Sequence, residues 1–212
     1  MHSSTPGRPL GGEAGMTGIA SRDLPAGLAA LISRAGLSGK GKPPVDKWNP
    51  PFCGDLDIRI ARDGSWHYMG SPIRREALVR LFASVLRQDD DGRHYLVTPV
   101  EKVGITVEDA PFLAVEMDVQ ADGPEQVLTL RTNVGDVIEA GPEHPLRFEI
   151  DAANGGLKPY VLVRGRLEAL FARPLLYELA EHMSDTDPEG AGRCGIWSKG
   201  AFFPVPDAVS ET

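Results

Sequence analysis

Segment 73–98 constrains this chain most, because most of it recurs about ninety residues further along. In each copy, apolar residues three and four positions apart predict an amphipathic helix. The matched positions are Arg75 with Arg164, Leu78 with Leu167, 81–83 with 170–172, and Leu86 with Leu175. A chain that repeats such a unit is expected to fold into two related halves.

The residues around each copy extend the repeat. Asp63-Gly64 precedes the first copy and Asn154-Gly155 precedes the second, and both dipeptides favour tight hairpin turns. A strand candidate follows each predicted helix, at 92–98 and at 192–198. Each half therefore reads strand, turn, strand, helix, strand. We interpret this pattern as an internal duplication, with an insertion at 184–191 in the second half.

Short runs of alternating apolar residues predict antiparallel sheets. Leu56, Ile58 and Ile60 alternate with charged residues, as in a strand with one buried face. Further strand candidates are 65–69, 103–107, 113–119, 126–132, 146–150 and 160–163. Many short strands and few helices predict an α+β fold.

Charge and composition exclude several classes of protein. The chain has 212 residues and a net charge of −8, and the part after residue 47 has sixteen basic against twenty-seven acidic side chains. Such a body repels nucleic acid, so we rank DNA and RNA binding low. No apolar run is long enough to span a membrane, and the first residues do not resemble a secretory signal. The two cysteines match no metal-site spacing, so we expect free thiols and a cytoplasmic location.

Residues 1–42 form an N-terminal extension that differs from the rest. Segment 1–15 is rich in Gly, Ser and Pro, and we expect it to be flexible. Leucines and Ile32 at helical spacing predict a short helix within 19–35, packed on the body or on a partner subunit.

The best candidate anion site is Arg74 and Arg75, at the start of the first predicted helix. Backbone N–H groups at a helix N-terminus already attract anions, and the arginines add positive charge. The alternative is that these arginines pair with acidic neighbours such as 89–91. Whether the repeated arginines Arg75 and Arg164 are structural or functional stays open.

Several motifs resemble the bacterial DUF1285 family, a domain of unknown function. The motifs are 43–50, 53–57 with 63–66, and 98–103 with 108–112. The resemblance covers 43–205 and implies two related domains, of which the C-terminal one is loosely similar to the pleckstrin-homology fold. It also implies a small-molecule or nucleotide-like ligand between the domains. We accordingly divide the chain into an N-terminal domain, 43–110, and a C-terminal domain, 111–212.

The first functional hypothesis is a non-catalytic ligand-binding or signalling module that holds an anionic small molecule between its domains. Arg74, Arg75 and Lys102 would neutralise the ligand. Trp66 or Tyr68 would stack on it, and Thr98 would donate a hydrogen bond. The remaining members of the candidate site are Glu101 and Asp109.

Two alternatives compete with this hypothesis. One is an enzyme that uses Glu101 or Asp109 as acid or base, which requires these carboxyls to be buried in a pocket. The sequence has no nucleophile elbow, zinc-ligand pair or dinucleotide fingerprint, and it implies no cofactor or metal. These missing motifs lower the odds of an enzyme without excluding one. The other alternative is an oligomeric scaffold, in which the N-terminal helix provides an apolar contact between copies.

Overall fold

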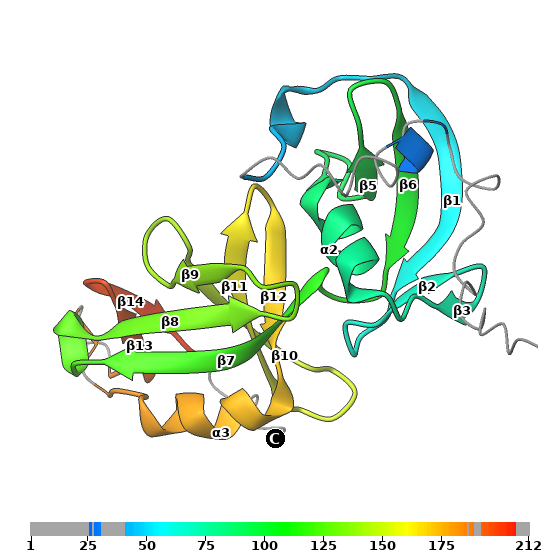
Figure 1. Cartoon of the computed structure of the whole chain (residues 1–212). Helices are drawn as coiled ribbons and strands as arrows, with labels where there is room; N and C mark the ends of the chain where they lie inside the picture. The colour runs from blue at the N-terminus through cyan, green and yellow to red at the C-terminus, as the bar shows by residue number, and fades with distance from the viewer. Residues whose placement is uncertain (1–25, 27, 31–40, 186, 189–191, 207–212) are drawn as a thin grey trace, which may run out of the picture.

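The computed structural model of the chain describes residues 26, 28–30, 41–185, 187–188 and 192–206 (Figure 1). Segment 1–15, which was expected to be flexible, lies outside these residues. Most of the predicted N-terminal helix also lies outside them. The described part of the extension includes Leu28, which is helical and fully buried. The extension therefore contributes at least one side chain to the core.

The N-terminal domain is built on a six-stranded sheet with the order β3-β2-β1-β6-β5-β4. Only β1 and β6 pair in parallel, and the other neighbours are antiparallel. The elements are η2 (Val45–Lys47), β1 (Phe52–Ile60), β2 (Trp66–Tyr68), β3 (Ser71–Pro72), α2 (Glu76–Ser84), β4 (Leu86–Gln88), β5 (His94–Val97) and β6 (Lys102–Val107).

The C-terminal domain has a second six-stranded sheet, with the order β10-β11-β12-β7-β8-β9. Here β12 and β7 are the parallel pair. The elements are β7 (Phe112–Gln120), η3 (Gly123–Glu125), β8 (Val127–Thr132), β9 (Val137–Glu139), β10 (Leu146–Ile150), β11 (Leu157–Arg164), β12 (Leu167–Phe171), α3 (Arg173–Glu181), β13 (Gly195–Ser198) and β14 (Ala201–Pro204).

The two domains share one strand topology. Each consists of two three-stranded antiparallel meanders, and the last strand of the second meander pairs in parallel with the first strand of the first. Thus β1 corresponds to β7 and β6 to β12. The helices break the correspondence, because α2 lies between the meanders and α3 follows the last strand. Two related domains with mostly antiparallel sheets were expected, but the fold is mainly β with little helix rather than α+β.

The predicted second helix is wrong. Segment 162–175 forms the end of β11, a turn at Gly165, all of β12 and the start of α3. Leu167 and Phe171 are four positions apart, and this spacing fits one face of a helix as well as one face of a strand. Leu167, Ala169 and Phe171 are all buried, and they occupy one face of β12. Pro174 lies in the first turn of α3, where a missing N–H costs nothing.

The core of the N-terminal domain explains why β1 and β2 form. Ile58 and Ile60 are buried, whereas the intervening charged residues of β1 face outward. Trp66 and Tyr68 on β2 face the same core, and the Trp66 ring stacks on Phe82 of α2 with 6.3 Å between ring centroids. Helix α2 packs on its sheet and points its C-terminal end towards the β11–β12 hairpin of the other domain (Figure 1).

Neither cysteine forms a disulfide, as expected. None of the helices in the described ranges is long and apolar enough to cross a membrane.

Candidate functional site

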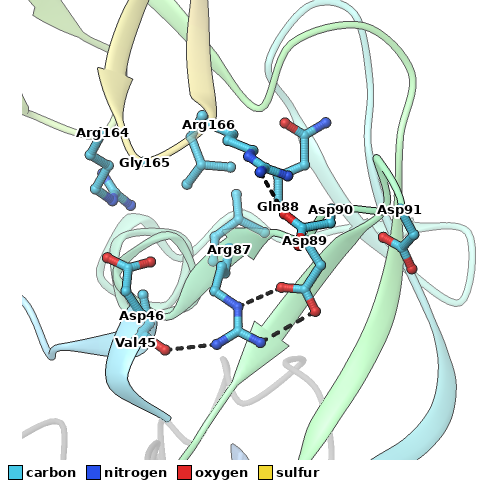
Figure 2. Close-up of a pocket in the computed structure, with 12 residues that line it drawn as sticks. Val45, Asp46, Arg87, Gln88, Asp89, Asp90, Asp91, Arg164, Gly165 and Arg166 are labelled. Atoms are coloured by element: carbon cyan, nitrogen blue, oxygen red, sulfur yellow. Dashed lines mark hydrogen bonds and ion pairs between the residues drawn. The ribbon is translucent and has the colours of Figure 1, made fainter. Parts of the chain in front are cut away.

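A cleft of about 650 Å³ lies where the two domains meet. Its walls come from η2, from β4 with the turn that follows it, and from the turn between β11 and β12 (Figure 2). The charged residues that line it are Asp46, Arg87, Asp89, Asp90, Asp91, Arg164 and Arg166. The cleft therefore combines guanidinium and carboxylate groups, and the partners of each group determine what it can bind.

Arg87 is fully engaged by the N-terminal domain. Its Nε lies 2.6 Å from Asp89 Oδ1, and its Nη1 donates to the carbonyl oxygens of Val45 and Trp48 at 2.9 and 2.7 Å. Lys102 also contacts Asp89, with 2.8 Å between Nζ and Oδ2. Burial raises the pKa of the Asp89 carboxyl, but the hydrogen bonds from Arg87 and Lys102 outweigh burial and leave the pKa below its usual value. This group of residues fixes η2 against β4.

Arg164 joins the two domains. Its Nη1 lies 2.7 Å from Asp136 Oδ2 within the C-terminal domain, and its Nη2 donates to the carbonyl oxygen of Ala83 in α2 at 2.6 Å. Lys42 forms a second ion pair with Asp136. Burial is the main cause that lowers the pKa of the Arg164 guanidinium, and Asp136 opposes the shift. Arg164 thus has structural contacts on both sides of the cleft.

Arg166 differs from the other two arginines of the cleft. Its one ion pair within the described chain joins Nη2 to Asp90 Oδ1 at 2.5 Å, and the two side chains are 56% and 94% exposed. Exposed ion pairs contribute about 0–1 kcal/mol, because water solvates both groups well when they separate. Arg166 can therefore exchange Asp90 for another anion at little cost.

A smaller cavity of about 180 Å³ adjoins the cleft and shares Gln88 and Arg166 with it. Asp109 lies on its wall, in the segment that joins the two sheets. The Asp109 carboxylate pairs with Lys158 and accepts a hydrogen bond of 2.8 Å from the Tyr160 hydroxyl. Burial raises the pKa of Tyr160, and the hydrogen bond to Asp109 acts in the same direction.

The residues predicted to stack on a ligand or to bind its charge lie elsewhere. Trp66 and Tyr68 are buried in the core, so their rings are not available to a ligand in the cleft. Arg74 and Arg75 are exposed at the N-terminal end of α2, whereas the cleft lies near the other end of this helix. Lys102 lies behind the cleft wall, where it contacts Asp89 and the Tyr95 ring.

Thr98 and Glu101 form a tight turn between β5 and β6. The Thr98 hydroxyl accepts hydrogen bonds from the backbone N–H groups of Val100 and Glu101. The Glu101 carboxylate, which is buried, accepts a hydrogen bond of 2.8 Å from the Leu28 backbone N–H. Glu101 therefore binds the N-terminal extension rather than lining a pocket.

Of the eight residues predicted for the site, only Asp109 lines a cavity between the domains. Sequence reasoning missed Arg87 and Arg166, and it placed Arg164 on a helix while leaving open whether this arginine is structural or functional. The sequence signal for Arg164 and Arg166 is the tripeptide Arg164-Gly165-Arg166. Its glycine has a φ of +52°, which reverses the chain and places both arginines on one turn. Among the described residues, no group of three or more His, Cys, Asp and Glu side chains could hold a metal ion.

Comparison with known proteins gives consistent matches over both domains. Residues 43–110 match the model described as "Domain of unknown function (DUF1285), N-terminal domain", and residues 111–205 match "Protein of unknown function (DUF1285), C-terminal domain". No curated protein matches the chain.

Two crystal structures are similar to this one. A DUF1285 family protein from Silicibacter pomeroyi DSS-3 is 51% identical, with a TM-score of 0.75 over 82% of this chain and 93% of the other. A DUF1285 family protein from Shewanella baltica OS155 is 26% identical, with a TM-score of 0.48 over 61% of this chain and 94% of the other.

Proposed function

The chain belongs to the DUF1285 family, and we propose that it is a non-catalytic ligand-binding or signalling module that holds a small anionic molecule in the cleft between its two domains. The observation that carries this proposal is Arg166, which lines the cleft and is held only by an exposed aspartate within the described chain. A phosphate or carboxylate that replaces Asp90 would form the charge-assisted, bidentate contact that a guanidinium favours.

The volume and the charges of the cleft limit the ligand. A volume of about 650 Å³ lies in the range of ordinary small-molecule sites. Asp46, Asp90 and Asp91 also line the cleft, and they would repel a ligand with many negative charges. Both features favour a compact ligand with one anionic group. A nucleotide-like molecule with a single phosphate fits this description.

Two finer proposals accompany this function. In a signalling role, the ligand would contact both domains, since the cleft is lined by residues from each. Binding would then stabilise the arrangement of the two domains that forms the cleft. We also propose that the C-terminal domain is loosely similar to the pleckstrin-homology fold. Its antiparallel meanders are followed by a single helix, α3, which supports that comparison.

The enzyme alternative has less support. Glu101 is buried, but its carboxylate is hydrogen-bonded to the Leu28 backbone. Asp109 lies on a cavity wall, but its two oxygens are bound to Lys158 and Tyr160. A general base needs an oxygen that can reach the substrate proton. Neither carboxylate offers one in this arrangement, so we favour binding over catalysis.

A thermal-shift screen tests the proposal. The wild-type protein and the variant Arg166→Ala are melted in the presence of nucleoside monophosphates, sugar phosphates and small carboxylates. A ligand at 100 times its Kd stabilises the native state by about 2.7 kcal/mol. This corresponds to a rise in Tm of roughly 5–10 °C for a chain of this size.

The matched control is Arg75→Ala, which removes an exposed arginine outside the cleft. We expect a compound that stabilises the wild type and the control but not Arg166→Ala. A stabilising compound that acts equally on all three proteins would contradict the proposed site. If no compound stabilises the wild type, the scaffold alternative is favoured, and light scattering of the full-length protein would then show an oligomer.

A further inference from the structure

The small cavity beside the cleft contains hydrogen-bonding groups that no protein contact uses. Gln88 and Arg166 line both cavities, so a molecule bound at Arg166 can extend from one into the other. We propose that the small cavity is a second subsite, which binds an uncharged, planar, hydrogen-bonding group of the same organic anion whose charged group lies at Arg166. This inference rests on the function proposed above and adds the chemistry of the ligand's other end.

The charged groups around the small cavity already compensate one another. Asp109 is paired with Lys158. Arg147 forms bonds of 2.9 and 2.6 Å from Nε and Nη2 to the two carboxylate oxygens of Glu168, and it also pairs with Glu149. A second charge on the ligand would have to break one of these pairs. An uncharged group avoids that cost.

His94 and Gln88 retain hydrogen-bonding capacity on the cavity wall. They are directly opposite each other in the register of β5 and β4, so their side chains lie on the same face of the sheet. Within the described chain, neither ring nitrogen of His94 has a hydrogen-bonding partner. Gln88 donates from Nε2 to the Gly92 carbonyl oxygen at 3.0 Å, which leaves its own amide oxygen as an acceptor.

The protonation of His94 favours an uncharged partner. Burial lowers the pKa of the His94 imidazole from its ordinary value, which favours the neutral form of the ring at pH 7. A neutral imidazole has one donor and one acceptor. A planar amide or a nitrogen heterocycle also presents a donor and an acceptor side by side, and either can pair with His94 and Gln88 together.

The volume of the small cavity agrees with a single ring. About 180 Å³ corresponds to roughly six water molecules at ~30 Å³ each. A five- or six-membered heterocycle displaces a similar number. A simple anion without such a group would occupy only the Arg166 end and would leave the small cavity hydrated.

Calorimetric titration with a matched pair of probes tests the subsite. Uridine monophosphate and ribose 5-phosphate share the phosphate and the sugar, and only the first carries a heterocycle, which is a single ring. We expect the heterocycle to improve the Kd for the wild type by about tenfold or more, as one or two new hydrogen bonds would do. His94→Phe fills the same space without hydrogen-bonding groups and should abolish this advantage while leaving the Kd of ribose 5-phosphate unchanged.

Gln88→Leu is a second variant with the same expected result, and it guards against misfolding of the first. His182→Phe, at the C-terminal end of α3, is the matched control and should bind as the wild type does. If the heterocycle improves binding equally in the wild type, His94→Phe and Gln88→Leu, the subsite is refuted, whereas loss of ribose 5-phosphate binding in Arg166→Ala would still support the proposed function. Binding of ribose 5-phosphate that is insensitive to Arg166→Ala refutes both.

Discussion

The guanidinium of Arg164 donates a hydrogen bond of 2.6 Å to the carbonyl oxygen of Ala83, so an arginine of the C-terminal domain caps the helix of the N-terminal domain. Helix α2 ends at Ser84, and the carbonyl groups of its last turn lack partners within the helix. The C-terminal end of a helix carries partial negative charge and favours a cation. This contact holds the two walls of the cleft together.

Arg164→Ala should therefore destabilise the whole protein. The substitution removes the Arg164 donor from the Ala83 carbonyl, which keeps only the Val85 backbone N–H, and it leaves Lys42 as the remaining partner of Asp136. We expect a loss of about 2–3 kcal/mol, below the usual cost of breaking a fully buried pair because 22% of the Arg164 side chain is exposed. Urea denaturation followed by fluorescence measures the change.

Arg173→Ala is the matched control for this experiment. Arg173 is exposed at the start of α3, and its removal should change the free energy of unfolding by less than about 0.5 kcal/mol. Equal unfolding midpoints for Arg164→Ala and Arg173→Ala would show that the cap contributes little.

The cluster around Asp89 predicts a dependence of stability on pH. The pKa of Asp89 in the folded state lies below its ordinary value, which is about 3.9 in an unfolded chain. The stabilisation by this carboxylate is therefore complete above about pH 5, where the unfolded carboxyl is fully ionised, and is lost as the pH falls through the lower, folded pKa. Asp89→Asn should cost about 1–2 kcal/mol at pH 7, and its deficit relative to the wild type should shrink towards pH 3.

Urea unfolding midpoints of the wild type and Asp89→Asn, measured from pH 7 to pH 3, test this prediction. Asp57→Asn, on the outer face of β1, serves as control because that side chain is exposed. A deficit for Asp89→Asn that stays constant across the whole range would mean that Asp89 is not the titrating group.

The sequence predicted strands well where alternation had only one interpretation. In β1 the apolar and charged residues alternate without a helical alternative, and the strand lies where it was expected. In β12, Leu167 and Phe171 are four positions apart, a spacing that fits both a helix face and a strand face, and matching to the first helix led to the wrong choice. The glycine between Arg164 and Arg166 was the local sign of a hairpin, and the proline after Arg173 was the sign of a helix start.

The candidate site was harder to predict than the fold, because its residues come together only through the arrangement of the domains. Arg87 and Arg166 are far apart in the sequence, and each belongs to an unremarkable strand or turn. Trp66 and Tyr68 were predicted to stack on a ligand, but they alternate on β2 and both point into the core. Core packing therefore explains an aromatic residue in a short strand more readily than ligand binding does.

Leu28→Ala should test whether the N-terminal extension is part of the folded body. Leu28 is fully buried, and loss of a buried leucine side chain costs about 2–5 kcal/mol. Tyr177→Ala is the control, because Tyr177 is 70% exposed and its removal should be nearly neutral. Thermal unfolding of the two variants compares them directly. Equal Tm values would mean that the extension does not stabilise the body.

Deletion of residues 1–42 should lower stability at least as much as Leu28→Ala, because the deletion also removes Lys42 from Asp136. Light scattering on the same sample tests the scaffold alternative. A deletion variant that keeps its melting temperature but changes its oligomeric state would favour a scaffold over a contribution to the core.

Glu101 should control how firmly the extension is held. Its carboxylate accepts the hydrogen bond from the Leu28 backbone N–H, and Glu101→Ala leaves this buried donor without a partner. An unsatisfied buried N–H costs about 1–3 kcal/mol, so hydrogen exchange at the Leu28 amide should accelerate by about tenfold or more. Glu101→Gln keeps an acceptor oxygen at the same position and should retain most of the protection. NMR-detected exchange measures both variants, and unchanged protection of Leu28 in Glu101→Ala would show that the extension is held by Leu28 packing alone.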